Sequence, residues 1–303
     1  MAIAGVAPID DAALRFAKSL SPVPSSPVDP TNALESDPQA ALLGHMLFFD
    51  TGLSRSGETS CATCHVPAKA FTDGVPLARG AAEGHFNTPT LLGVAHNRWF
   101  FWDGRADSLW SQALVPIEHQ LELDNSRTDA LRHIASTPAL KKQFIAVGGT
   151  MPDVFDLERF PIGAKPGTDT WNAMTPEDQN AVTAAYVLLG KAIASFERQL
   201  SPGESDFDRW VASINANQRD DNLMTPAALR GFALFANEAG CGQCHFGATI
   251  SDLEFHDLAL APTDPANPPP GRGGGYAMLR ANEFRSDGIW SDAPESRKAR
   301  RAA

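Results

Sequence analysis

The stretches that decide the fold are two pentapeptides, Cys61-Ala62-Thr63-Cys64-His65 and Cys241-Gly242-Gln243-Cys244-His245. Together they contain all four cysteines of the 303-residue sequence. In each motif, two thiols one helical turn apart can add to the two vinyl groups of a porphyrin, and the histidine that follows can ligate the iron. We therefore expect two covalently bound c-type haems, with His65 and His245 as the proximal ligands.

Other uses of paired cysteines fit the spacing less well. A zinc ribbon places its two Cys-x-x-Cys pairs about 15–20 residues apart, whereas 180 residues separate Cys61 from Cys241. A thioredoxin-like redox pair has no need for the following histidine. A disulfide across two intervening residues is strained, and two copies would be unusual in a chain of this size.

Composition indicates a folded protein that does not bind nucleic acid. Hydrophobic residues make up 43% of the chain and charged residues 20%, and the net charge is −11. An acidic surface disfavours nucleic acid and anionic membranes and is compatible with a basic redox partner. No run of apolar residues is long enough to span a membrane. The amino terminus shows no signal peptide, but haem attachment outside the cytoplasmic membrane favours a periplasmic location.

The hydrophobic pattern predicts a mainly α fold with few or no strands. Helices are expected over residues 11–20, 38–49, 106–115, 127–147, 175–200 and 227–239. The helix after Thr175 has the strongest start signal, because a threonine N-cap is followed by proline and two acids. The Pro/Gly-rich tail over 261–276 is expected to be loop.

Each haem motif follows a helix that contains a Leu-Phe pair, which suggests two related cytochrome c-like domains. We expect an N-terminal haem domain over 36–205 and a C-terminal haem domain over 220–303. Only 58 residues follow His245, so the second domain is expected to be incomplete at its C-terminus.

Several further stretches resemble the bacterial di-haem cytochrome c peroxidase and MauG family. They are Gly44-His-Met-Leu-Phe-Phe-Asp50, Phe71-Thr-Asp-Gly74, Asn87-Thr-Pro-Thr-Leu-Leu92, Phe101-Trp-Asp-Gly-Arg-Ala-Asp107 and Phe255-His-Asp-Leu258. The resemblance implies a periplasmic enzyme that reduces hydrogen peroxide at the N-terminal haem. The C-terminal haem would then relay electrons from a small cytochrome c or a copper protein.

The resemblance also assigns roles around the first haem. A peroxidase needs a distal group to move a proton between the peroxide oxygens, and Glu122 matches the distal glutamate of the family. Gln112 matches a glutamine of the same pocket, and Trp102 a tryptophan between the two haems. Taken alone, the three would be a solvated acid, a helix-surface glutamine and a core tryptophan. The spacing of Glu122 from Trp102 and Pro116 favours the catalytic interpretation.

Two neighbouring features carry weaker assignments. Asn87 matches a residue that binds a structural calcium ion in the family, and the alternative is a turn or capping asparagine. Asp103 and Arg105 are expected to form a buried ion pair or to contact a haem propionate, without a catalytic role.

The chain departs from the classical peroxidases at two places. Their removable histidine cap on the reactive iron has no counterpart in residues 79–82, and His85 lies several positions too late. An open first haem would not need prior reduction, as in MauG-like enzymes. For the second haem, His256, Tyr276 and Met278 are local candidates, but none has the family's position, so no distal ligand is assigned.

Three functions therefore remain. The first is a di-haem peroxidase that takes electrons from a small redox protein. The second is a MauG-like oxidase that uses peroxide to modify a residue of a partner protein. The third, of another class, is a di-haem electron carrier in which Glu122 and Gln112 line no pocket.

Overall fold

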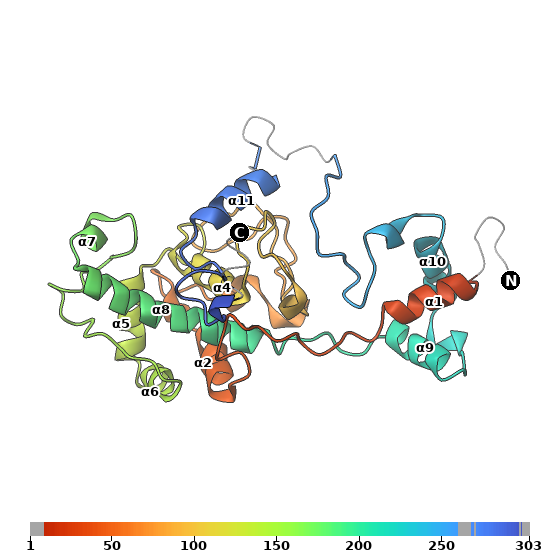
Figure 1. Cartoon of the computed structure of the whole chain (residues 1–303), viewed down its shortest axis with the longest axis horizontal. Helices are drawn as coiled ribbons and strands as arrows, with labels where there is room; N and C mark the ends of the chain where they lie inside the picture. The colour runs from red at the N-terminus through yellow and green to blue at the C-terminus, as the bar shows by residue number, and fades with distance from the viewer. Residues whose placement is uncertain (1–8, 260–267, 270, 297, 299–303) are drawn as a thin grey trace. The chain divides into compact units, whose positions relative to one another are not determined.

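The computed structural model describes residues 9–259, 268–269, 271–296 and 298, and these residues are mainly helical (Figure 1). Among them there is no β-strand, only three isolated bridges. The α-helices are α1 (Asp11–Ser19), α2 (Pro38–Phe49), α3 (Cys61–Cys64), α4 (Leu109–Glu118), α5 (Arg127–Ser136), α6 (Pro138–Ala146), α7 (Asp169–Asn172), α8 (Pro176–Glu197), α9 (Asp206–Asn215), α10 (Pro226–Ala236) and α11 (Gly271–Ala281). The predicted mainly α fold is confirmed.

The chain forms two compact units. The smaller unit comprises residues 1–26 and 202–260, and the larger unit comprises 27–201 and 261–303. The predicted C-terminal domain over 220–303 is thus divided between them, since α11 belongs to the larger unit. The assignment of one haem to each of 36–205 and 220–303 stays a prediction, although each unit contains one Cys-x-x-Cys-His motif.

The smaller unit contains the three helices α1, α9 and α10, and α10 leads in sequence to the second motif. Trp210 is fully buried at its centre, where its ring packs against Phe207 and Phe232. The indole Nε1 of Trp210 donates to Asp221 at 2.9 Å, so the one polar atom of this core aromatic is satisfied.

The larger unit is organised around α8, which packs along α2 and α4 (Figure 1). Two glycines permit the close approach of these helices. A Cβ on Gly44 of α2 would collide with the Ala192 carbonyl, and a Cβ on Gly190 of α8 would lie 2.5 Å from the Trp110 carbonyl. One turn before Gly190 on α8, Tyr186 is buried and its hydroxyl donates to the Leu114 carbonyl at 2.7 Å.

Local start signals explain most helix bounds. Helix α8 begins as predicted, because the Thr175 side chain accepts from the Asp178 amide and Pro176 takes the first helical position. Helix α2 has the predicted bounds. The single helix predicted over 127–147 is wrong, because Pro138 lacks the amide that would continue α5 and instead starts α6.

The loop predicted over 261–276 is confirmed at 268–269 but wrong over 271–276. Residues 261–267 and 270 lie outside the described residues, but 271–276 form the first half of α11. Tertiary contacts override the low helix propensity of this glycine-rich segment. Arg272 donates to the Gly104 carbonyl at 2.8 Å and lies over the Trp99 ring, while Gly275 packs on the Asp103 backbone.

Among the described residues, no helix combines the length and the apolar character that crossing a membrane requires.

Candidate functional site: two haem-attachment motifs

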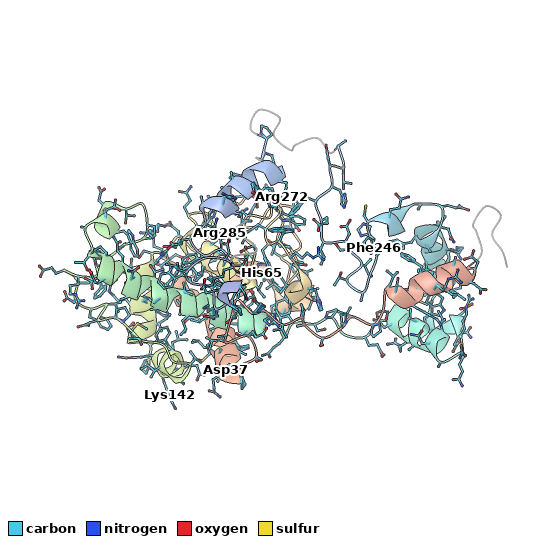
Figure 2. All side chains as sticks on the ribbon, in the orientation of Figure 1. Asp37, His65, Lys142, Phe246, Arg272 and Arg285 are labelled. Atoms are coloured by element: carbon cyan, nitrogen blue, oxygen red, sulfur yellow. The ribbon has the colours of Figure 1, made fainter. Side chains whose placement is uncertain are left out.

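The first motif forms the short helix α3 in the larger unit. The Ser60 amide donates to Thr63 Oγ1 at 3.0 Å, which starts the helix immediately before Cys61. Cys61 and Cys64 therefore lie one turn apart on one side of α3. His65 ends the helix, with its amide bonded to the Cys61 carbonyl. Figure 2 shows His65 inside the larger unit.

The orientation of His65 is fixed by the loop that follows. Its Nδ1 lies 3.1 Å from the Phe71 carbonyl, so this nitrogen carries the proton and Nε2 is left for a ligand. Phe71 has a φ of 57°, a left-handed conformation that turns its carbonyl back toward the imidazole. Burial lowers the pKa of His65, which favours the neutral imidazole that binds metals.

The second motif repeats this arrangement in the smaller unit. His245 Nδ1 lies 3.0 Å from the Ile250 carbonyl, and Ile250 also has a positive φ, of 52°. The His245 ring is 6.2 Å from that of Phe235. An apolar cavity of about 270 Å³ lies beside it, lined by Leu20, Phe207, Gly231, Phe232, Phe235 and Ile250. An apolar wall beside an imidazole of fixed orientation fits one face of a porphyrin.

The donor sets fit covalent haem better than a thiolate-bound metal. All four cysteines are free of disulfides. Burial, with the nearby carboxylates of Glu197 and Glu122, raises the pKa of Cys61 to about 12, which disfavours the thiolate that zinc requires. Both motifs instead present two thiols free of disulfides and one imidazole with a fixed tautomer.

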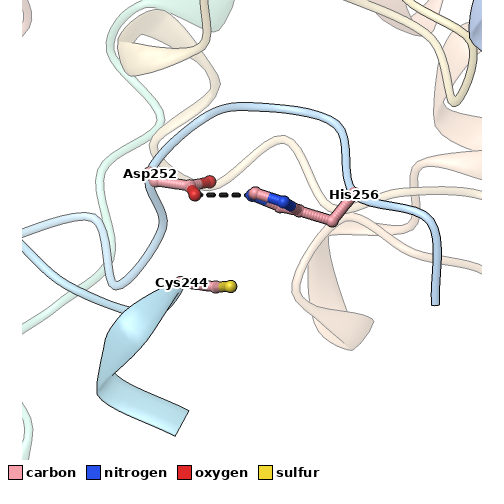
Figure 3. A group of neighbouring side chains, drawn as sticks. All are labelled: Cys244, Asp252 and His256. Atoms are coloured by element: carbon pink, nitrogen blue, oxygen red, sulfur yellow. Dashed lines mark hydrogen bonds and ion pairs between the residues drawn. The ribbon is translucent and has the colours of Figure 1, made fainter. Parts of the chain in front are cut away.

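One further group of ligand atoms lies beside the second motif. Cys244, Asp252 and His256 bring their ligand atoms within 4.8 Å of one another (Figure 3). His256 Nε2 is 2.6 Å from Asp252 Oδ2. Because Cys244 belongs to the haem-attachment motif, this trio is not assigned to a separate metal ion. The other two candidate ligands, Tyr276 and Met278, are exposed on α11 in the larger unit.

Glu122 lies in a tight turn after α4. The Glu122 amide donates to the His119 carbonyl at 2.9 Å, and the Leu123 amide donates to the Pro116 carbonyl at 3.1 Å. Gln112 is half-buried on α4, one turn before Pro116, so the two share a helix face. The structure thus places Gln112, Pro116 and Glu122 on one helix and the turn that ends it.

The segment over 79–82 packs directly on this turn. The Ala81 amide donates to the Glu122 carbonyl at 2.8 Å, and the Ala82 amide donates to the Leu121 carbonyl at 3.2 Å. Gly80 is required, because a Cβ there would lie 2.7 Å from Glu122 Cα. The stretch in which a histidine cap is missing therefore braces the backbone of Glu122, a contact that sequence reasoning did not predict.

Electrostatics relate Glu122 to the first motif. Burial raises its pKa, and the Arg105 guanidinium partly opposes this shift. Its side chain remains 39% exposed. The carboxylate also contributes to raising the pKa of both Cys61 and Cys64. A carboxyl group with a raised pKa near the haem-attachment cysteines is suited to proton transfer at the first haem.

Trp102 and Asn87 are linked to each other. The Trp102 indole donates to the Asn87 carbonyl at 2.8 Å, and the indole is 55% exposed rather than in the core. Asn87 Nδ2 donates to the Val75 carbonyl at 2.6 Å. Calcium at Asn87 and electron transfer at Trp102 stay predictions. The expected Asp103–Arg105 ion pair is confirmed, at 3.1 Å.

Two haem-attachment motifs on a helical fold define a di-haem c-type cytochrome. Residues 38–216 match the family described as di-haem cytochrome c peroxidase. This match covers more than half of the sequence, so the chain belongs to the di-haem cytochrome c peroxidase family.

The similar proteins include some named MauG and some named cytochrome c peroxidase. Methylamine utilization protein MauG of Methylorubrum extorquens is 36% identical over 74% of this chain and 54% of its own. Cytochrome c551 peroxidase of Nitrosomonas europaea is 30% identical over 82% of this chain and 64% of its own. The diheme peroxidase BthA of Burkholderia thailandensis superposes with a TM-score of 0.61 at 25% identity, over 86% of this chain and 66% of that one. The chain thus spans between half and two thirds of these relatives.

Proposed function

We propose that the protein reduces hydrogen peroxide at the first haem site, with Glu122 as the acid–base group. The observation that carries this proposal is the fixed position of Glu122, whose backbone is braced by residues 79–82 near the first attachment motif. A haem held by Cys61, Cys64 and His65 would supply the redox-active iron at which peroxide binds.

The protein's own contribution to the chemistry is the movement of one proton. A Glu122 carboxylate oxygen takes the proton from the inner peroxide oxygen and returns it to the outer oxygen, so that the O–O bond breaks with water as the leaving group. The pKa of Glu122, raised by burial, lies closer to neutral pH than that of an exposed glutamate, which suits both halves of this transfer. Gln112, one turn before Pro116, offers an amide that orients the peroxide.

Electrons reach this site through the second haem in our proposal. The donor is a small cytochrome c or a copper protein in the periplasm, and the net charge of −11 supports a basic partner. Trp102 supports the transfer because its indole is held by Asn87 and yet 55% exposed.

A second candidate is a MauG-like oxidase that modifies a residue of a partner protein. It is favoured by residues 79–82, which contain no histidine and lie on the backbone of Glu122. Such a site would accept peroxide without prior reduction. The similarity to proteins named for methylamine utilization supports the same candidate.

Addition of one equivalent of peroxide to the oxidised protein, without reductant, tests the proposal. We expect an optical change at the haems, slowed about 10²–10⁴-fold by Glu122→Gln, the range for positioned acid–base groups. Glu83→Gln is the matched control, because Glu83 is an exposed carboxylate directly after the segment that braces Glu122. Two low-spin haems that do not respond to peroxide would instead show the electron carrier.

A further inference from the structure

The loop that carries Trp102 has a strained backbone. It is closed by a bridge between Phe100 and Ala106, in which the Phe100 amide donates to the Ala106 carbonyl at 2.9 Å. Phe101, immediately before Trp102, has a φ of 65°, and Gly104 has a φ of 70°. A left-handed conformation costs free energy in a bulky residue such as phenylalanine, so it persists only where the surrounding structure holds it. The position of Trp102 therefore depends on the contacts that hold this loop.

Arg272, in the first turn of α11 (Figure 2), contacts the loop on both sides of Trp102. Its Nη1 donates to the carbonyls of Asp103 and Gly104, at 3.2 and 2.8 Å. Its guanidinium carbon lies 4.5 Å from the centre of the Trp99 ring, which precedes the bridge. One side chain thus ties the entry of the loop to its exit.

Helix α11 is held in place by further contacts, so it can act as a fixed support for Arg272. Gly275 packs so closely that a Cβ there would lie 2.1 Å from the Asp103 carbonyl oxygen. After the helix ends, the Ser286 amide donates to Asp107 Oδ1 at 3.0 Å, and the Ser286 hydroxyl donates to Oδ2 of the same carboxylate. The helix and the residues after it are therefore fastened to the same part of the chain at two more points.

The chemistry of the contact suits an arginine, because a guanidinium can lie over an indole and donate to carbonyls at the same time. The structure assigns Arg272 as the positioning residue of Trp102, which holds the indole in one place for electron transfer between the two haem sites. This inference rests on the role of Trp102 in the proposed function. Electron transfer through an aromatic ring depends on the distances to the groups on either side of it, so a loop that moves would slow the transfer.

The position of the indole can be measured without turnover. The protein is labelled with 5-fluorotryptophan, reduced, and bound to carbon monoxide so that the haem irons are diamagnetic. The fluorine resonance of Trp102 is then the one lost in Trp102→Phe. Arg272→Ala should shift or divide this resonance, because the loop gains further conformations. Arg280→Ala is the matched control and should leave it unchanged, because it removes the same charge from an exposed position of the same helix.

The same variants test electron transfer between the two haems, followed by pulse radiolysis. Arg272→Ala should slow the transfer by up to about 10²-fold, the cost of a ~1 Å misplacement. Arg272→Lys should recover part of the rate, since an ammonium can donate to the same carbonyls. Gly275→Ala, which pushes α11 away from the Asp103 backbone and keeps Arg272, should also slow the transfer.

A Trp102 resonance that Arg272→Ala leaves unchanged would overturn the inference. A wild-type rate in Arg272→Ala beside a slowed rate in Trp102→Phe would overturn it as well. If Trp102→Phe itself transfers electrons at the wild-type rate, the role of Trp102 in the proposed function fails, and the role of Arg272 in electron transfer fails with it.

Discussion

Replacement of Gly80 by alanine should disturb catalysis without touching any chemical group of the site. A Cβ at this position would lie 2.7 Å from Glu122 Cα, from the Glu122 carbonyl oxygen and from the Leu121 carbonyl oxygen. All three atoms belong to the backbone, so no flexible side chain can move aside. The segment over 79–82 and the Glu122 turn must therefore separate.

The geometry gives the size of the effect. Ordinary van der Waals contact begins at 3.4 Å, so the two segments must move apart by about 0.7 Å at normal carbon radii. The hydrogen bonds from Ala81 and Ala82 to this turn would be weakened, and at about 0.5–1.5 kcal/mol each their loss costs about 1–3 kcal/mol of stability. A displacement of about 1 Å at a catalytic group can slow a reaction about 10²-fold.

The assay is the single-turnover reaction with peroxide, beside urea unfolding monitored by circular dichroism. Gly203→Ala is the control, because a Cβ at Gly203 meets nothing within 4 Å. We expect Gly80→Ala to bind both haems, to lose stability and to react more slowly than the control. A variant with wild-type stability and rate would refute the argument that residues 79–82 position Glu122.

Four further predictions follow from the sites. Pyridine haemochrome should count two haems per chain, and one or none would contradict the assignment of both motifs. The fully oxidised protein should show a high-spin first haem by electron paramagnetic resonance, whereas a low-spin first haem that becomes high-spin only in His85→Ala would identify His85 as a cap. The peroxide reaction needs the Glu122 carboxylate, so its rate should fall as the pH drops through a pKa that burial holds above the usual 4.5, and a fall only below that value would contradict the role. Burial raises the pKa of Glu197 to about 8, so the wild-type protein should lose stability as the pH rises from 4.5 through 8. In urea unfolding at pH 5 and pH 9, Glu197→Gln should remove up to about 5 kcal/mol of this loss. An equal pH dependence of both proteins would contradict this role of Glu197.

The sequence was sufficient to predict the features that local chemistry determines. The two attachment motifs need only two cysteines and a histidine at fixed spacing, and the family match supports them. The starts of α2 and α8 were predictable because Asp37 and Thr175 cap them and a proline follows each cap. These signals act over three or four residues and do not depend on the rest of the fold.

Features that depend on long-range packing were missed. Helix α11 begins in a glycine-rich stretch that is held by the backbone of Asp103 and Gly104. The brace on Glu122 joins segments about 40 residues apart through main-chain atoms, so no side-chain pattern announces it. His119 and Glu122 are separated by only two residues, but only the turn shows that their side chains lie 3.3 Å apart.

The matched carbonyl contacts of the two proximal histidines limit where the two haems can differ. His65 and His245 each give Nδ1–H to a backbone carbonyl, at 3.1 and 3.0 Å, and both carbonyls belong to residues with positive φ. Such a bond raises the basicity of the imidazole and favours the higher oxidation state of its metal. Haems bound at the two motifs would therefore have proximal imidazoles of similar basicity, supplied by His65 and His245. In our proposal the two sites differ instead in the groups around them, with Glu122 near the first motif.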